Sequence, residues 1–187
     1  MSATLGLLAG GRASRLGGID KAWMQRDGVP QVLRMARRFG PKVAEVLVSA
    51  NRDLARYVQA GLQAVPDRHA GIGPIGGLDA LAQACRTPWL LTLPVDLVDA
   101  NDCLFDSLAA AGGKGAYVED AGGVQPLVAL WQVDALRPAL HQAIAAGEYS
   151  VQRLQQSLGM SRVRLEGVRM GNLNTFEDLD AAGVQVE

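Results

Sequence analysis

Short apolar runs alternate with amphipathic stretches along most of this chain. A continuous apolar run of about four to eight residues predicts a buried strand, whereas apolar residues spaced three and four apart predict a helix. The first pattern predicts strands at residues 5–9, 43–50, 62–65, 89–93, 116–119, 127–132 and 162–166. The second pattern predicts helices at residues 30–39, 52–60, 134–146 and 151–158, one that ends near Cys85, one from Asn101 to about Ala111, and a short one after Thr175.

This alternation predicts the fold class. Strand and helix follow one another regularly as far as about residue 111, which indicates a Rossmann-like α/β fold with a doubly wound, mostly parallel sheet and helices on both faces. The predicted strands at 116–119 and 127–132 flank Gly122–Gly123 and predict a hairpin, so we expect a mixed sheet. No internal repeat, low-complexity tract or linker interrupts the sequence. Residues 1–187 are therefore expected to form a single domain.

Composition narrows the possible functions. With 187 residues, 49% apolar and 20% charged, the chain has the composition of an ordinary globular protein. A formal net charge of −1 provides no global field to attract nucleic acid or anionic lipid. Two cysteines and two histidines supply neither a disulfide framework nor a structural zinc site. The N-terminal residues lack the basic n-region and the cleavage site of a signal peptide, so we expect none, and no apolar run approaches the ~18–20 residues of a membrane span. We expect a cytoplasmic protein without nucleic-acid or membrane partners.

The first predicted strand is followed by a glycine-rich, basic segment. The strand ends at Gly10–Gly11, and Arg12, Arg15 and Lys21 follow within a few residues, with Asp20 as the only acid. Glycines let a backbone approach a ligand closely, and successive N–H groups with nearby cations form a site for a polyphosphate. The segment matches neither a P-loop nor a dinucleotide-binding fingerprint. We expect it to hold the phosphates of a nucleoside triphosphate; an ordinary strand-to-helix turn with solvated arginines is the alternative.

Polar residues also follow the next predicted strands. Ser49 and Asn51 follow the second strand, Asp67 the third and Asp96 the fourth, and the carboxyl ends of strands are where open α/β sheets bind ligands. Asp96 ends a buried run and is suited to bind Mg²⁺, which prefers one or two carboxylates with phosphate oxygens and water; it could instead cap a helix or brace a loop. Asp67 could accept hydrogen bonds from the N1–H and N2 edge of guanine, contact the ribose, or belong to a simple turn.

Six segments together resemble a known family. LAGGRASRLGGIDKA resembles the signature L-A-G-G-x-x-x-R-M-G-x-x-D-K of the molybdenum cofactor guanylyltransferases, in the MobA-like nucleotidyltransferase superfamily, with Leu16 in place of methionine. Further similar segments follow in family order over nearly the whole chain: SANR, GPIGGL, LPVD, QPLVAL and NLNTFEDL. The chain departs from the family pattern at Ser49, usually asparagine, at Leu97 in the segment after Asp96, and at Phe176, usually proline.

The resemblance implies an activity and a set of site residues. It implies a fold like that of nucleotide-diphospho-sugar transferases, and transfer of GMP from Mg²⁺–GTP to the terminal phosphate of molybdenum-bearing molybdopterin, with pyrophosphate released. It implies transient contact with cofactor-biosynthesis proteins or molybdoenzymes. Lys21, Arg15 and Asp96 would carry catalysis, with Asp96 as the Mg²⁺ ligand. The implied nucleotide and cofactor site contains Leu8, Ala9, Gly10, Gly11, Lys21, Ser49, Asn51, Asp67, Gly76, Asp96, Asn172 and Asn174.

Two other functions remain open at this point. A sibling transferase could use CTP or another small phosphorylated acceptor, and a non-catalytic protein could bind the nucleotide or the cofactor without turnover. The presence of both Lys21 and Asp96 favours an active enzyme. Outside these segments, Arg34, Arg37 and Arg38 lie mostly off the apolar face of the predicted helix at 30–39, and we expect a solvated surface there.

Overall fold

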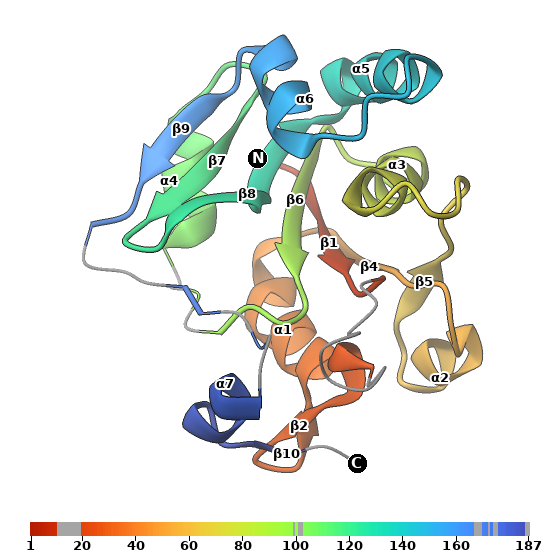
Figure 1. Cartoon of the computed structure of the whole chain (residues 1–187), viewed down its shortest axis with the longest axis vertical. Coiled ribbons are helices and arrows are strands. Elements are labelled where there is room, and N and C mark those ends of the chain that lie inside the picture. The colour runs from red at the N-terminus through yellow and green to blue at the C-terminus, as the bar shows by residue number, and fades with distance from the viewer. Residues whose placement is uncertain are drawn as a thin grey trace.

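The computed structural model describes residues 1–10, 20–98, 100, 103–166, 170–171, 173 and 176–185. Its main feature is a seven-stranded sheet in the order β5-β4-β1-β6-β8-β7-β9 (Figure 1). Neighbouring strands of this sheet pair in parallel, except that β8 runs antiparallel to both β6 and β7. The strands are β1 Ala3–Leu8, β4 Glu45–Ser49, β5 Gln63–Val65, β6 Trp89–Pro94, β7 Gly115–Asp120, β8 Gly123–Gln132 and β9 Ser161–Arg164.

Helices cover both faces of this sheet, which confirms the predicted fold class (Figure 1). Because successive strand residues point to opposite faces, Leu91 and Leu93 pack in one core while Leu90 packs in the other. The first core contains residues of α1 and α4, and the second contains residues of α3, α5 and α6. The helices are α1 Gln31–Phe39, α2 Leu54–Gln59, α3 Pro74–Ala84, α4 Leu104–Ala110, α5 Val133–Ala145, α6 Val151–Leu158 and α7 Phe176–Ala181.

A small second sheet was not predicted from the sequence. It has three strands in the order β10-β2-β3, each two residues long: β2 Gln25–Arg26, β3 Val29–Pro30 and β10 Val184–Gln185. Asp27 and Gly28 join β2 to β3 with φ angles of 54° and 72°, as a tight hairpin turn requires. Met24, Leu179 and Val184 bury their side chains beside this sheet. Two-residue strands carry no measurable periodicity, so no sequence pattern could predict them.

Several element boundaries differ from the predicted ones. Helix α3, for which only the end was predicted, begins at Pro74, because Gly73 turns the chain with φ 66° and proline suits the first helical position. In α4 the N-cap position is taken by Cys103 and not by Asn101, which lies outside the described residues, as does Thr175. Helix α6 has the predicted bounds.

Two short 3₁₀ helices complete the described elements, η2 Lys21–Trp23 and η3 Gly40–Lys42. Both were absent from the sequence prediction. Among the described helices, none combines the length and the apolar character needed to cross a bilayer.

The buried carboxylate of Asp120, at the end of β7, binds the later segment that contains Met170 through a hydrogen bond. Its side chain is 6% exposed. Its Oδ1 accepts a hydrogen bond from Gly122 N at 2.8 Å, and its Oδ2 accepts one from Met170 N at 2.7 Å. Because the two oxygens accept from two different backbone N–H groups, Asp120 holds the β7–β8 turn and the region of Met170 together.

Replacement of Asp120 by asparagine should destabilise the protein. Whichever way the amide is oriented, an NH₂ group replaces one oxygen and faces a backbone N–H, so one buried donor loses its acceptor. We expect Asp120→Asn to lower the free energy of unfolding by ~1–3 kcal/mol, measured by urea denaturation. Asp180→Asn, an exposed control on α7, should change this free energy by less than ~0.5 kcal/mol. Equal values for the two variants would refute the structural role of Asp120.

Candidate active site

The Asp67 carboxylate is held by the side chains of Ser49, the last residue of β4, and Asn51, which follows this strand. Ser49 Oγ donates to Asp67 Oδ1 at 3.1 Å, and Asn51 Nδ2 donates to Asp67 Oδ2 at 2.9 Å. Asn51 Oδ1 in turn accepts from Asp67 N at 2.8 Å. These three hydrogen bonds fix the orientation of the carboxylate. Each carboxylate oxygen can accept a further hydrogen bond, so the orientation leaves acceptor capacity for a ligand.

Glycines let the backbone approach these side chains closely. A Cβ on Gly77 would lie 2.6 Å from Ser49 Oγ and 3.0 Å from Leu8 Cδ2. A Cβ on Gly76 would lie 2.9 Å from a backbone oxygen of His69 and 3.1 Å from Asp67 Oδ2. No side chain larger than hydrogen fits at either position without displacing its neighbours. We call the five residues Ser49, Asn51, Asp67, Gly76 and Gly77 the Asp67 cluster.

Residues of β1 and its end border this cluster. Ala9 N, just beyond β1, donates to Ser49 O at 2.9 Å, which extends the parallel pairing of β1 with β4. A Cβ on Gly10 would lie 3.4 Å from Asn51 Nδ2. Leu8, Ala9 and Gly10 therefore lie beside the residues that follow β4. Gly11 and Arg15 lie outside the described residues, so the course of the glycine-rich segment beyond Gly10 stays a prediction.

Lys21 and Asp96 form an ion pair at the end of β6. Lys21 Nζ lies 2.7 Å from Asp96 Oδ2, and each side chain is 17% exposed. Asp96 lies in the turn that follows β6, and the strand order β5-β4-β1-β6 places this turn at the same edge of the sheet as the residues after β4 and β5. The sequence placed both residues in the site, but it did not predict that they contact each other. The pairing shows that the Asp96 carboxylate accommodates a cation.

The backbone around Asp96 contacts the region of the two predicted asparagines. Leu173 N donates to Asp96 O at 3.1 Å, and Val98 N donates to Gly171 O at 2.9 Å. Asn172 and Asn174 themselves lie outside the described residues, so their roles stay predictions. The residues beside them nevertheless lie against the turn that carries Asp96.

Lys21 is held in place by the residues next to it in η2. The Asp20 side chain caps this helix by accepting from Ala22 N at 3.0 Å. Trp23 packs on Tyr57 of α2 with 4.9 Å between ring centroids, and the Arg56 guanidinium lies 4.2 Å from the Trp23 ring centroid. Burial raises the pKa of Asp20 above its ordinary value, and burial together with the charge of Asp20 raises the pKa of Tyr57. Tyr57 therefore contributes to the site as a packing partner of Trp23.

Comparison with known proteins identifies the family. Residues 6–163 match the MobA-like NTP transferase domain, which covers most of the chain. The chain belongs to the MobA-like NTP transferase family. It is 38% identical over 181 residues to a molybdenum cofactor guanylyltransferase of Cereibacter sphaeroides, a match that covers 94% of this chain and 93% of the relative.

Two solved structures share the fold at lower identity. Molybdopterin-guanine dinucleotide biosynthesis protein A of Archaeoglobus fulgidus matches with a TM-score of 0.73 and 18% identity, over 96% of both chains. The 2-C-methyl-D-erythritol 4-phosphate cytidylyltransferase of Thermus thermophilus matches with a TM-score of 0.72 and 22% identity, over 98% of both chains. The MobA-like fold thus occurs in a guanine-dinucleotide biosynthesis protein and in a cytidylyltransferase, so the fold alone does not determine the base.

Sequence reasoning singled out Gly76 but left Gly77 out of the predicted site. Gly77 makes the closer approach, 2.6 Å from its virtual Cβ to Ser49 Oγ. The adjacent glycines in GPIGGL were the available signal, because two glycines in the first turns of a helix cost stability unless close packing requires them.

Alanine at Gly77 should therefore destabilise this helix instead of stabilising it. In an ordinary helix interior, Gly→Ala gains ~0.5–1 kcal/mol, but here the new methyl group collides with Ser49 and Leu8. We expect Gly77→Ala to lower the free energy of unfolding by ~1–3 kcal/mol, measured by urea denaturation. In a Ser49→Ala background the nearest collision is absent, so the same substitution should cost ~1 kcal/mol less. An equal cost in both backgrounds would show that Ser49 and Gly77 do not interact.

Proposed function

We propose that this enzyme transfers GMP from Mg²⁺–GTP to the terminal phosphate of molybdopterin that carries molybdenum. The products are the guanine dinucleotide form of the cofactor and pyrophosphate. The observation that carries this proposal is the 38% identity to a molybdenum cofactor guanylyltransferase over 94% of the chain. The ion pair of Lys21 and Asp96 and the Asp67 cluster supply groups suited to the phosphates and to the base.

The reaction requires positioning more than covalent chemistry. An oxygen of the acceptor phosphate forms a bond to the α-phosphorus of GTP, and the bond from that phosphorus to the pyrophosphate oxygen breaks. Because the acceptor phosphate is already anionic, it needs no side chain to activate it and no covalent enzyme intermediate. The protein contributes by aligning the two phosphates and by neutralising the charge that develops between them.

Lys21 and Asp96 fit this task. Lys21 Nζ would donate to phosphate oxygens of the nucleotide, and the Asp96 carboxylate would hold Mg²⁺. Asp96 fits the ion because its Oδ2 already accepts a cationic group at 2.7 Å, and because Mg²⁺ uses one or two carboxylates with phosphate oxygens and water. No group of three potential metal-ligating side chains occurs in the described part of the chain, so phosphate and water would complete the coordination. When bound, the ion would neutralise part of the negative charge of the phosphates.

Asp67 is the group best placed to recognise guanine. Its carboxylate is fixed by Ser49 and Asn51, and it can accept from both N1–H and the N2 amino group of guanine. Cytosine presents no such pair of donors. Ser49 replaces the usual asparagine of the family, and its hydroxyl donates to Asp67, so the substitution preserves a hydrogen-bond donor to this carboxylate.

The base preference tests this assignment against a cytidylyltransferase. We expect GTP to bind more tightly than CTP, ATP or UTP in the presence of Mg²⁺, measured by calorimetry. Asp67→Asn should reduce the preference for GTP over CTP by about tenfold or more, because an amide replaces one of the two acceptors. Tighter binding of CTP than of GTP by the wild-type protein would overturn the guanylyl assignment.

The metal requirement tests the role of Asp96. Asp96→Asn keeps the size of the side chain but removes the charge that a hard cation requires. Turnover should fall by roughly 10²–10³-fold, the scale for loss of one charge-stabilising group. The Mg²⁺ concentration needed for half-maximal turnover should also rise in Asp96→Asn. If Asp96 were only a structural residue, the variant would instead have a lower thermal midpoint and an unchanged Mg²⁺ dependence. Asp180→Asn serves as the exposed control for both measurements. Wild-type turnover in Asp96→Asn would remove this residue from the mechanism.

A further inference from the structure

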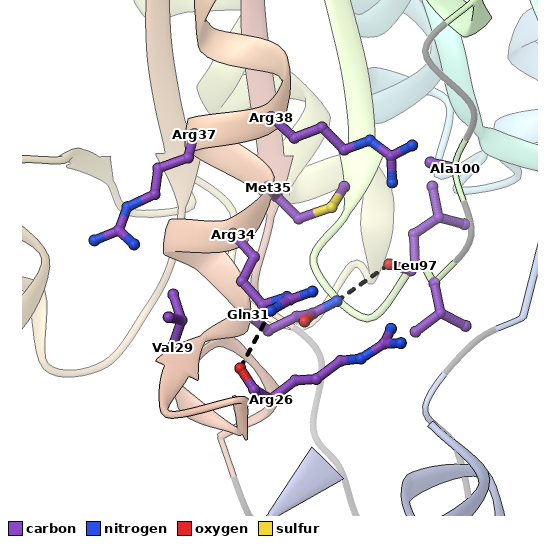
Figure 2. A pocket seen from close by; sticks show the side chains of 10 residues that line it. Arg26, Val29, Gln31, Arg34, Met35, Arg37, Arg38, Leu97 and Ala100 are labelled. Carbon is purple, nitrogen blue, oxygen red and sulfur yellow. Dashed lines mark hydrogen bonds between the residues drawn. The ribbon is translucent and has the colours of Figure 1, made fainter. Parts of the chain in front are cut away.

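A concave site lies on the α1 side of the main sheet. A cavity of about 370 Å³ opens between α1, the β2–β3 hairpin and the residues Leu97, Val98 and Ala100 (Figure 2). The Asp67 cluster does not line this cavity. The ten lining residues include four arginines, which are Arg26, Arg34, Arg37 and Arg38. We call this cavity the arginine pocket.

The described lining of the arginine pocket is basic. None of the described residues that line it is acidic. Asp27 lies next to it in the β2–β3 turn, with Oδ2 3.3 Å from Arg34 Nη1, but its side chain is 79% exposed. A chain with a formal net charge of −1 thus gathers several guanidinium groups around one small cavity.

A buried acceptor without a partner points to a ligand in the same cavity. Gln31 lines the arginine pocket and is 4% exposed. Its Nε2 donates to Leu97 O at 3.2 Å, which fixes the orientation of the amide. No donor among the described residues reaches Gln31 Oε1. A buried acceptor left unpaired costs ~1–3 kcal/mol, so a hydroxyl or N–H group of a ligand would satisfy a real deficit.

The arginines lie around this amide. Figure 2 shows Arg26 and Arg38 extending toward the side of Leu97 and Ala100, one on each side of Gln31, with Arg34 next to it. Arg34 Nη1 donates to Arg26 O at 3.2 Å, which ties α1 to the hairpin. Figure 2 also shows Arg37 extending from the opposite side of α1.

We propose that the arginine pocket binds an organic phosphate. Arg26, Arg34 and Arg38 hold the phosphate, and a hydroxyl or N–H group on the organic part donates to Gln31 Oε1. Guanidinium groups match phosphate oxygens in paired hydrogen bonds. A phosphate monoester carries about −1.5 to −2 charge, which suits several arginines better than one carboxylate does. The volume of about 370 Å³ suits a small molecule.

Two sources could supply this ligand. The phosphate could belong to the acceptor substrate, because the pocket contacts Leu97, the residue directly after Asp96. It could otherwise belong to a separate phosphorylated effector. The first source rests on the proposed function, whereas binding of an organic phosphate to the pocket does not.

Binding of a simple probe tests the site without any turnover. Glycerol 3-phosphate, which combines a phosphate with hydroxyl groups, should bind the wild-type protein by calorimetry. The double variant Arg26→Gln/Arg38→Gln should bind it at least about tenfold more weakly, since two charge-assisted contacts are lost. Arg86→Gln removes one arginine charge at an exposed position before β6 and should bind it as the wild type does. Equal affinity in the double variant and in Arg86→Gln would overturn the proposal.

A second probe tests the role of Gln31 independently of the arginines, and a single variant tests the site if the double variant does not fold. Ethyl phosphate has no donor on its organic part and should bind more weakly than glycerol 3-phosphate; equal binding would overturn the assignment of Gln31 to the ligand. If the double variant melts early, Arg38→Gln alone tests the site, because Arg38 is exposed. The single variant should also weaken glycerol 3-phosphate binding, and unchanged binding would count against the site.

Kinetics of guanylyl transfer then distinguish the two sources. If the acceptor fills the pocket, Arg38→Gln should raise the KM for molybdopterin and leave the KM for GTP unchanged. If a separate effector fills it, both KM values should stay at the wild-type level while glycerol 3-phosphate binding is lost. Absence of any guanylyl transfer by the wild-type protein would defeat the proposed function but leave the binding result valid.

Discussion

The ion pair between Lys21 and Asp96 joins segments that lie 75 residues apart in the sequence. One partner begins η2, after the glycine-rich segment, and the other lies in the turn after β6. Because each side chain is only 17% exposed, water screens this pair less than a surface pair. The Asp20 cap and the Trp23–Tyr57 contact hold η2 in the place that the pair requires. A phosphate group that drew Lys21 away would expose a carboxylate ready for another cation.

The parallel strands explain why chemically different residues meet at one edge. Strands β5, β4, β1 and β6 are neighbours that run in the same direction, so the residues following each of them emerge together. Asp67 thereby meets Ser49 and Asn51, and the end of β1 passes beside both. Glycines at the start of α3 allow the helix to approach these side chains within contact distance. Because Gly76 and Gly77 have no Cβ, the residues of the Asp67 cluster can pack closely.

Sequence patterns predicted the parts of this molecule that depend on local chemistry. The buried runs predicted the strands β1 and β6, and the position of Asp67 and Asp96 after their strands predicted the edge at which they lie. The contact of Lys21 with Asp96 could not be predicted, because it depends on where η2 lies in three dimensions. The two-residue strands carry no pattern, and the expectation of a solvated face at Arg34, Arg37 and Arg38 missed the pocket because Leu97 comes from a distant segment. Whether residues 1–187 form a single domain and whether the protein is cytoplasmic stay predictions.

The turn after β6 links the two candidate sites physically. The Asp96 side chain pairs with Lys21, while Asp96 O accepts from Leu173 N. One residue further, Leu97 O accepts from Gln31 Nε2 in the arginine pocket, and Val98 N donates to Gly171 O. Consecutive residues of this turn therefore contact a cation, an amide of α1 and the C-terminal region. The hydrogen bond of Gln31 to Leu97 O thus connects the arginine pocket directly to the turn that carries Asp96, the residue that we propose as the magnesium ligand.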